Sequence, residues 1–164
     1  MNTPHVFASL EALLPFVQSW RIKSERVVFT NGCFDVLHAG HFYVLEEAAK
    51  KGHRLIVGIN TDLSISRLKG PQRPILPLDE RMAMVAGLRC VDAVIAFDTP
   101  TPEDLIKAIS PDVLVKGGDY TPDTMAGAKW VVEKGGEIAI IPLKEGISTS
   151  TIIERIINKA KASF

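Results

Sequence analysis

The sequence has no excess charge of either sign and very few cysteines. Its 164 residues carry 19 lysines and arginines against 19 aspartates and glutamates, so no net positive field attracts nucleic acid or an anionic membrane. Its two cysteines, Cys33 and Cys90, form no paired framework, which is typical of proteins in a reducing cytosol. We therefore expect a cytoplasmic protein with neither nucleic acid nor a membrane as partner.

Long apolar runs are also missing. The longest, such as Ile138–Ile141, have the length of a buried strand, whereas a membrane span needs about 20 residues. The N-terminus lacks a basic region followed by an apolar stretch, so we expect no signal peptide. The length suits a single domain with a substantial core.

From Val27 onward, short apolar runs alternate with segments of helical periodicity. The predicted strands are Arg26–Thr30, Arg54–Asn60, Ala93–Phe97, Val113–Lys116 and Glu137–Ile141. The predicted helices are Ala39–Lys51, Leu78–Leu88, Pro102–Ile109, Thr124–Lys134 and Thr149–Lys161. This alternation predicts an α/β fold of the Rossmann-like, doubly wound kind, with a parallel five-stranded sheet and helices on both faces.

Residues 1–25 precede this pattern and form an N-terminal helical extension to a main domain of residues 26–164. An amphipathic helix is predicted from Ser9 to Trp20, packed on the sheet domain or on a neighbouring subunit. The apolar residues that recur there at helical spacing are Leu10, Leu13, Leu14 and Val17.

The most informative segment follows the first predicted strand and reads Asn-Gly-Cys-Phe-Asp-Val-Leu-His-Ala-Gly-His, residues 31–41. His38 and His41 lie three residues apart at the start of a predicted helix, on roughly one face. Gly40 between them has no Cβ and lets a ligand approach the backbone. Helix N-termini attract phosphate, and imidazoles there can donate hydrogen bonds to its oxygens. The segment therefore predicts a phosphate-binding site.

Two other interpretations of the histidines remain open. The local backbone could satisfy both side chains at a helix start, or they could join Cys33 or Asp35 as zinc ligands. The glycine between the histidines, the preceding strand and the lack of a Cys-x-x-Cys motif all favour phosphate over zinc. We expect no metal bound by the protein itself.

Further polar, glycine-containing segments end later strands. Lys116–Tyr120 follows the fourth strand, and Lys144–Ser150 follows the fifth and opens the last helix. Because ligands bind outside the carboxyl ends of parallel strands, these segments and residues 31–41 are expected to converge. The aperiodic segment Asp62–Pro77 carries basic residues and is either a solvated loop or a mobile flap that closes over anionic substrates.

Two motifs carry a resemblance to a known family. Gly32-Cys33-Phe34-Asp35 with His38-Ala39-Gly40-His41, and then Glu145-Gly146-Ile147-Ser148-Thr149-Ser150, resemble the signatures of the cytidylyltransferase-like nucleotidyltransferases. The second signature usually ends in two threonines, and Ser150 keeps the hydroxyl. The resemblance covers about residues 26 to 158, so it makes residues 26–164 a nucleotidyltransferase domain.

Within that family, the middle of the chain is most similar to heptose-1-phosphate adenylyltransferases, the nucleotide-transferring half of bacterial ADP-heptose synthases. Many of these are fused to a sugar kinase, and this chain resembles the stand-alone form. The segments concerned are Arg67-Leu68-Lys69-Gly70, Arg73-Pro74, Glu80-Arg81 and Val115-Lys116-Gly117-Gly118-Asp119-Tyr120.

The resemblance implies transfer of AMP from ATP to a heptose 1-phosphate, with release of pyrophosphate and formation of ADP-heptose for lipopolysaccharide or capsule. Mg²⁺ would bind through the triphosphate, and the protein would be a homodimer. The implied catalytic residues are His38, His41, Lys69 and Arg89. The nucleotide would bind Phe34, Asp35, His38, Gly40, His41, Lys116, Gly146, Ile147, Ser148, Thr149 and Ser150, and the sugar phosphate Arg67, Lys69, Arg73 and Asp119.

Alternatives remain for single residues and for the function. Arg89 could instead cap a helix C-terminus, and Asp119 could cap a turn.

The same signatures occur in glycerol-phosphate and phosphoethanolamine cytidylyltransferases. A non-catalytic nucleotide-binding module, or a nicotinamide-binding redox domain, could share the sheet. The redox domain expects Gly-x-Gly-x-x-Gly after the first strand, whereas the turn Asn31–Val36 has a single glycine.

Overall fold

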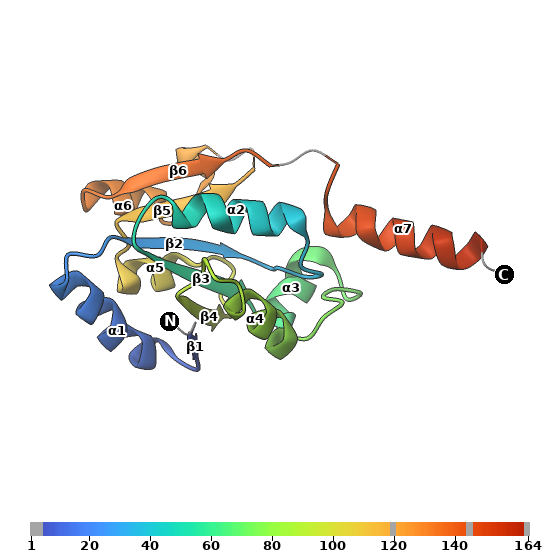
Figure 1. Cartoon of the computed structure of the whole chain (residues 1–164), viewed down its shortest axis with the longest axis horizontal. Coiled ribbons are helices and arrows are strands. Elements are labelled where there is room, and N and C mark those ends of the chain that lie inside the picture. Colours follow the sequence, from blue (N-terminus) through green and yellow to red (C-terminus); the bar gives the residue numbers. More distant parts are fainter. Residues whose placement is uncertain (1–4, 119–120, 144–145, 163–164) are drawn as a thin grey trace.

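One parallel sheet forms the centre of the molecule (Figure 1). The computed structural model describes residues 5–118, 121–143 and 146–162. The sheet has six strands in the order β1-β4-β3-β2-β5-β6. Their bounds are β1 His5–Phe7, β2 Val27–Gly32, β3 Arg54–Asn60, β4 Ala93–Phe97, β5 Val113–Gly117 and β6 Glu137–Ile141.

The predicted Rossmann-like α/β class is confirmed, with six strands in place of the expected five. The additional strand, β1, pairs in parallel with β4, with His5 opposite Ala93 and Phe7 opposite Ile95. It lies in the segment for which only a helix was predicted. A strand of three residues is too short to show an alternating pattern, so it could not be predicted from periodicity.

Seven α-helices and one short 3-10 helix connect or follow the described strands. They are α1 Leu10–Ile22, α2 Ala39–Ala49, α3 Asp62–Lys69, α4 Leu78–Ala86, α5 Glu103–Ile109, η1 Pro122–Thr124, α6 Ala128–Glu133 and α7 Thr149–Ala162. No helix in the described parts of the chain combines the length and apolar character that crossing a membrane requires.

The prediction of a loop for Asp62–Pro77 is wrong over its first half, because α3 begins at Asp62. The helix start is stabilised by Thr61, whose hydroxyl accepts a hydrogen bond from the backbone N–H of Ser64 at 3.2 Å. Asp62 in the first turn and Lys69 in the last also suit the helix dipole. The signal was present in the capping residues rather than in apolar periodicity.

Two apolar layers cover the faces of the sheet. Side chains alternate along β2, so Val27 and Phe29 join one layer while Val28 joins the other. The first layer includes Leu13 and Val17 of α1, both fully buried. The apolar stripe of the N-terminal helix therefore packs on this chain's own sheet.

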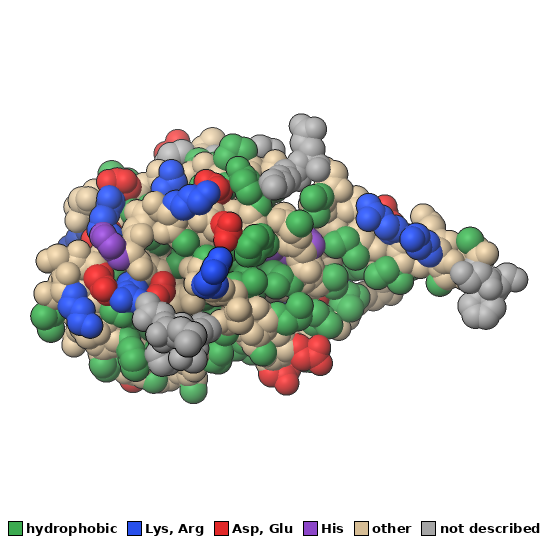
Figure 2. All heavy atoms as spheres, viewed as in Figure 1, with side chains coloured by type: hydrophobic (Ala, Val, Ile, Leu, Met, Phe, Trp, Pro, Cys, Tyr) green, Lys and Arg blue, Asp and Glu red, His purple; other side chains and the backbone are tan. Residues whose placement is uncertain are grey.

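The last helix is unlike the others because it extends away from the body of the molecule (Figures 1 and 2). No side chain of Thr149–Ala162 is buried in this chain. Ile156 is 61% exposed and Ile157 is 46% exposed. The start of α7 nevertheless lies against the carboxyl ends of the strands, where the candidate site is found.

Candidate active site

A cavity of about 900 Å³ opens at the carboxyl ends of β2 and β5. These two strands are neighbours in the sheet. From β2 the chain continues to β3 and β4 on one side and then crosses to β5 and β6 on the other, so the direction in which strands are added reverses between β2 and β5. Ligands bind at such a reversal in doubly wound sheets. The predicted site residues that line the cavity are Phe34, His38, Gly40, His41, Lys69, Arg73, Lys116, Ile147, Ser148, Thr149 and Ser150.

His38 is the N-cap of α2. Its Nδ1 accepts hydrogen bonds from the backbone N–H groups of Gly40, at 3.1 Å, and His41, at 3.3 Å. The interpretation in which local backbone satisfies a histidine is thus correct for this nitrogen. Because Nδ1 is an acceptor, the neutral ring carries its proton on Nε2, which stays available as a donor. A Cβ on Gly40 would lie 3.0 Å from the His38 ring, so this cap needs a glycine there.

His41 stacks on His38, with ring centroids 3.8 Å apart and planes at 16°. Its Nδ1 is buried and has no hydrogen-bond partner among the described residues. Burial, together with the neighbouring His38 and Lys69, lowers the pKa of His41 to about 4. Burial also lowers the pKa of His38. Both rings are therefore neutral at pH 7, and each could donate one hydrogen bond to a ligand without carrying a fixed positive charge.

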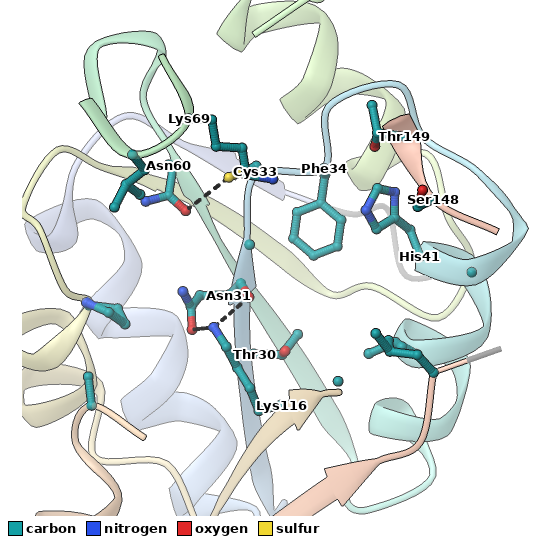
Figure 3. A pocket seen from close by; sticks show the side chains of 18 of the residues that line it. Thr30, Asn31, Cys33, Phe34, His41, Asn60, Lys69, Lys116, Ser148 and Thr149 are labelled. Carbon is teal, nitrogen blue, oxygen red and sulfur yellow. Dashed lines mark hydrogen bonds between the residues drawn. The ribbon is translucent and has the colours of Figure 1, made fainter. Parts of the chain in front are cut away.

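The turn between β2 and α2 holds an unusual backbone. Phe34 and Val36 have φ angles of 49° and 55°, in the left-handed region that non-glycine residues rarely adopt. This conformation places the Phe34 ring edge-on to His41, with centroids 5.3 Å apart. Figure 3 shows the two rings side by side, with Ser148 and Thr149 close to His41.

Asp35 does not line the cavity, although the resemblance implies nucleotide binding. It is 1% exposed, and its carboxylate accepts hydrogen bonds from Arg73 Nε at 2.6 Å, Ile75 N at 2.9 Å and Leu76 N at 3.0 Å. Burial would raise the pKa of this carboxyl, but these donors stabilise the charged form and hold the pKa below its usual value. Asp35 thus fixes the segment before α4 against the turn.

Arg73 is held in place by that ion pair and also lines the cavity. Its Nη2 is buried and has no hydrogen-bond partner among the described residues. A guanidinium fixed through Nε keeps its other donors in a planar arrangement that suits a phosphate or carboxylate.

Lys116 is the last residue but one of β5 and points toward Asn31, the last residue but one of β2 (Figure 3). Its ammonium donates to Asn31 Oδ1 at 2.9 Å and to the Asn31 carbonyl at 3.3 Å. Burial holds the pKa of Lys116 below its usual value. An anion bound beside this group would relieve the cost of burying its charge.

The start of α7 completes the cavity wall. The Ser148 hydroxyl accepts from Thr151 N at 3.1 Å, and Thr151 Oγ1 accepts from Ser148 N at 2.9 Å, which is a reciprocal cap. Thr149 donates its hydroxyl to the carbonyl of Asp35 at 2.7 Å. The first-turn N–H groups of a helix have no partner within the helix, so those of Thr149 and Ser150 could receive an anion.

Besides Asp35, three predicted residues do not line the cavity, and one more lies outside the described residues. Arg67 is exposed and forms an ion pair with Asp98 at 3.5 Å. The cavity lining does not include Arg67, Arg89 or Gly146. Arg89 is exposed between α4 and β4. Asp119 lies outside the described residues. The roles that the resemblance implies, for these residues and for those that line the cavity, remain predictions.

Some residues that line the cavity were not among the site residues predicted from the sequence. Asn31 lies one residue before the end of β2, Asn60 ends β3, and Phe97 ends β4. Their place at the carboxyl ends of predicted strands was the available signal. The described lining contains no carboxylate, and the described residues hold no group of three or more His, Cys, Asp or Glu side chains that could bind a metal ion.

A family model described as Cytidylyltransferase-like matches residues 29–155. The chain belongs to this family. The match spans both signature segments and the cavity between them, so the family that the motifs resemble is confirmed.

Curated relatives agree over most of the chain. It is 54% identical over 151 residues to "Bifunctional protein HldE" of Ectopseudomonas mendocina, which covers 92% of this chain and 32% of the relative. It is 53% identical over 145 residues to the protein of the same name from Vibrio vulnificus, covering 88% of this chain and 30% of the relative. The chain therefore spans about a third of the length of these curated relatives.

A solved structure described as the lipopolysaccharide core biosynthesis protein from Thermoplasma volcanium is also similar. It has a TM-score of 0.58 and 27% sequence identity, and the likeness covers 73% of this chain and 97% of that one.

Proposed function

We propose that this chain transfers AMP from ATP to a heptose 1-phosphate, releasing pyrophosphate and forming ADP-heptose for lipopolysaccharide or capsule. The observation that carries this proposal is the composition of the cavity. Two histidines, two lysines and an arginine meet the first turn of a helix there, and the described lining has no carboxylate. Such a site fits two polyanionic substrates at once.

The reaction joins an oxygen of the sugar phosphate to the α-phosphorus of ATP. The bond from that phosphorus to the bridging oxygen of pyrophosphate breaks, and its electron pair leaves with pyrophosphate. The attacking phosphate is already ionised at neutral pH, so no general base is required. Catalysis then consists of positioning the reactants and stabilising charge on the transferring group.

Neutral His38 and His41 suit that task. Each ring can donate one hydrogen bond to an oxygen on which negative charge increases in the transition state. A neutral donor holds the anionic ground state less strongly than a cation would. In this proposal, the N–H groups of Thr149 and Ser150 hold the leaving pyrophosphate. Lys69 and the buried Nη2 of Arg73 bind the sugar phosphate.

Mg²⁺ would enter with ATP, bound to triphosphate oxygens, and would shield charge on the polyphosphate. Among the described lining residues, only neutral oxygens, such as that of Asn31 and the hydroxyls at the start of α7, could contact such an ion. This donor set fits a metal carried by the nucleotide.

We also propose that the protein acts in the cytoplasm as a homodimer. Both cysteines are free thiols, which suits a reducing compartment. The second copy would cover α7, because a 14-residue helix with no buried side chain is only marginally stable on its own. The stripe of Leu13 and Val17 does not need a second copy, since it is buried within the chain.

The acceptor and the base rest on the resemblance of Arg67–Arg73 and Lys116–Tyr120 to heptose-1-phosphate adenylyltransferases. The similarity to a structure named for lipopolysaccharide core biosynthesis supports the choice of a sugar phosphate as acceptor. Pyrophosphate release tests the choice, with ATP or CTP offered against heptose 1-phosphate and glycerol 3-phosphate. The fastest turnover is expected for ATP with heptose 1-phosphate. Faster turnover of CTP with glycerol 3-phosphate would reject the adenylyltransferase assignment.

A further inference from the structure

Arg81 of α4 is fully buried behind the active-site turn, although it is always charged. Its guanidinium donates four hydrogen bonds. Nη1 reaches the carbonyls of Cys33 at 2.7 Å and Asn60 at 2.9 Å, Nε reaches the carbonyl of Leu76 at 3.0 Å, and Nη2 reaches Asp62 Oδ1 at 2.6 Å. A buried guanidinium needs such complete pairing to offset its lost hydration.

These four acceptors belong to different parts of the site. Cys33 precedes Phe34 in the active-site turn, and Asn60 ends β3. Asp62 begins α3, the helix that ends with Lys69, and Leu76 belongs to the segment whose N–H groups bind Asp35. The Arg81 side chain therefore joins the turn before the histidines to α3, which carries Lys69, and to the following segment, which carries Arg73.

The turn needs such anchors because its backbone is strained. Phe34 and Val36 both have left-handed φ angles, which are particularly unfavourable for a β-branched residue such as Val36. Arg81 holds the carbonyl before Phe34, and Thr149 holds the carbonyl after it, that of Asp35. The Phe34 ring between the two anchors packs against His41.

We propose that Arg81 is a positioning residue for the transfer reaction: it keeps the strained turn in the conformation that places Phe34 against His41. This inference rests on the proposed function for its kinetic consequence, but its structural consequence can be measured without substrate. Lysine cannot replace arginine here, because a single ammonium cannot span acceptors arranged around a planar fork.

The test compares Arg81→Lys with Arg54→Lys. Arg54 is the matched control because its side chain is 17% exposed and pairs with Glu25 at 2.7 Å and Asp92 at 2.9 Å, at the amino end of β3 away from the cavity. Both variants are assayed at a temperature at which circular dichroism shows each to be folded. Arg81→Lys is expected to lower kcat at least tenfold with KM for ATP within about threefold, since small displacements of catalytic groups can cost as much as a hundredfold. Arg54→Lys should stay within about twofold of wild type in kcat.

The second measurement is the nuclear Overhauser effect between the ring protons of Phe34 and His41. It should weaken in Arg81→Lys and persist in Arg54→Lys. An unchanged effect in Arg81→Lys, an unchanged kcat, or equal losses in both variants would overturn the inference. If wild-type protein shows no turnover with any of the four substrate pairs, the proposed function fails, and the ring contact alone decides the role of Arg81.

Should Arg81→Lys fail to fold, Asp62→Asn replaces it. This change removes the charge that pairs with Nη2 but keeps a side-chain oxygen that can accept from Nη2, and the Asp62 side chain is 47% exposed, so the loss of stability should be smaller than for removal of the partner. A two- to fivefold fall in kcat with a weaker Phe34–His41 contact is expected. Wild-type values for both would overturn the inference.

Discussion

The hydroxyl of Thr149 donates a hydrogen bond to the backbone carbonyl of Asp35 across 2.7 Å, joining residues that are 114 positions apart. The bond ties the first residue of α7 to the turn that follows β2. The two signature segments of the family thus form one wall of the cavity. The bond brings the N-terminus of α7 to the histidine pair, because Asp35 lies only three residues before His38 in the chain.

The Asp35 carboxylate should matter more for stability than for direct contact with a ligand. Asp35→Asn would place an amide NH₂ among donors that include Ile75 N and Leu76 N, and would leave Arg73 without its charged partner. We expect the free energy of unfolding to fall by about 2–5 kcal/mol, as for other broken buried pairs. Urea unfolding measures it. A loss below about 1 kcal/mol would show that the carboxylate is not a structural anchor.

His41→Ala should lower kcat far more than it weakens nucleotide binding. The ring lies where charge is expected to increase in the transition state, and loss of one such donor costs about 10²–10³ in kcat in comparable sites. Steady-state kinetics and calorimetry with ATP on the same preparation separate the two effects. Turnover near the wild-type level would exclude His41 from catalysis.

Lys69→Ala should raise KM for the sugar phosphate or lower turnover without destabilising the fold. Lys69 is the exposed last residue of α3 and lines the cavity, so its loss removes a positive charge but little packing. Lys129→Ala is the control, because its side chain is 92% exposed on α6. Kinetics and thermal melts are compared for both. Lys69 would prove to be structural if its variant melted as early as a core mutant does.

The low pKa of His41 makes stability depend on pH in a known direction. Its pKa is about 4 in the folded protein and 6.5 when unperturbed, so the unfolded chain binds more protons between these values. Stability should therefore fall as pH decreases from 6.5 to about 4. His41→Gln removes this group, and its urea unfolding free energy should fall less over that range. Parallel curves for the variant and the wild type would contradict the assigned pKa.

The apolar stripe of α7, which consists of Ile152, Ile153, Ile156 and Ile157, should form the dimer interface. We expect light scattering to give a dimer mass for the wild type at micromolar concentrations and a monomer mass for Ile156→Glu, because a charge at an apolar interface is costly. Asn158→Glu adds the same charge on the same helix, away from the stripe, and should leave the dimer intact. A wild-type monomer would refute the proposal.

The sheet was largely predictable because buried parallel strands appear as short apolar runs. Three of the five predicted strands, Arg54–Asn60, Ala93–Phe97 and Glu137–Ile141, have the observed bounds. β1 was not predictable, since three residues carry no period. α3 was missed because its residues are mostly polar and its signal lies in the Thr61 cap.

The site was predictable where function and local sequence coincide, as at His38 and His41. It was not predictable where a role depends on distant partners. Asp35 lies inside a signature but is buried against a segment 38 to 41 residues away. Arg81 is a charged residue on a helix, a type that is usually exposed, and its four acceptors come from separate elements. Such contacts are determined by the tertiary structure and not by spacing.

Identification of the product decides whether this chain transfers AMP to a sugar phosphate. The wild-type protein is incubated with ATP, heptose 1-phosphate and Mg²⁺, and the products are examined by ³¹P nuclear magnetic resonance and mass spectrometry. The account predicts one equivalent of pyrophosphate and a sugar nucleotide in which AMP is joined to the sugar phosphate through a new phosphoanhydride. Release of ADP and transfer of the γ-phosphoryl group, or no phosphoanhydride product at all, would contradict it.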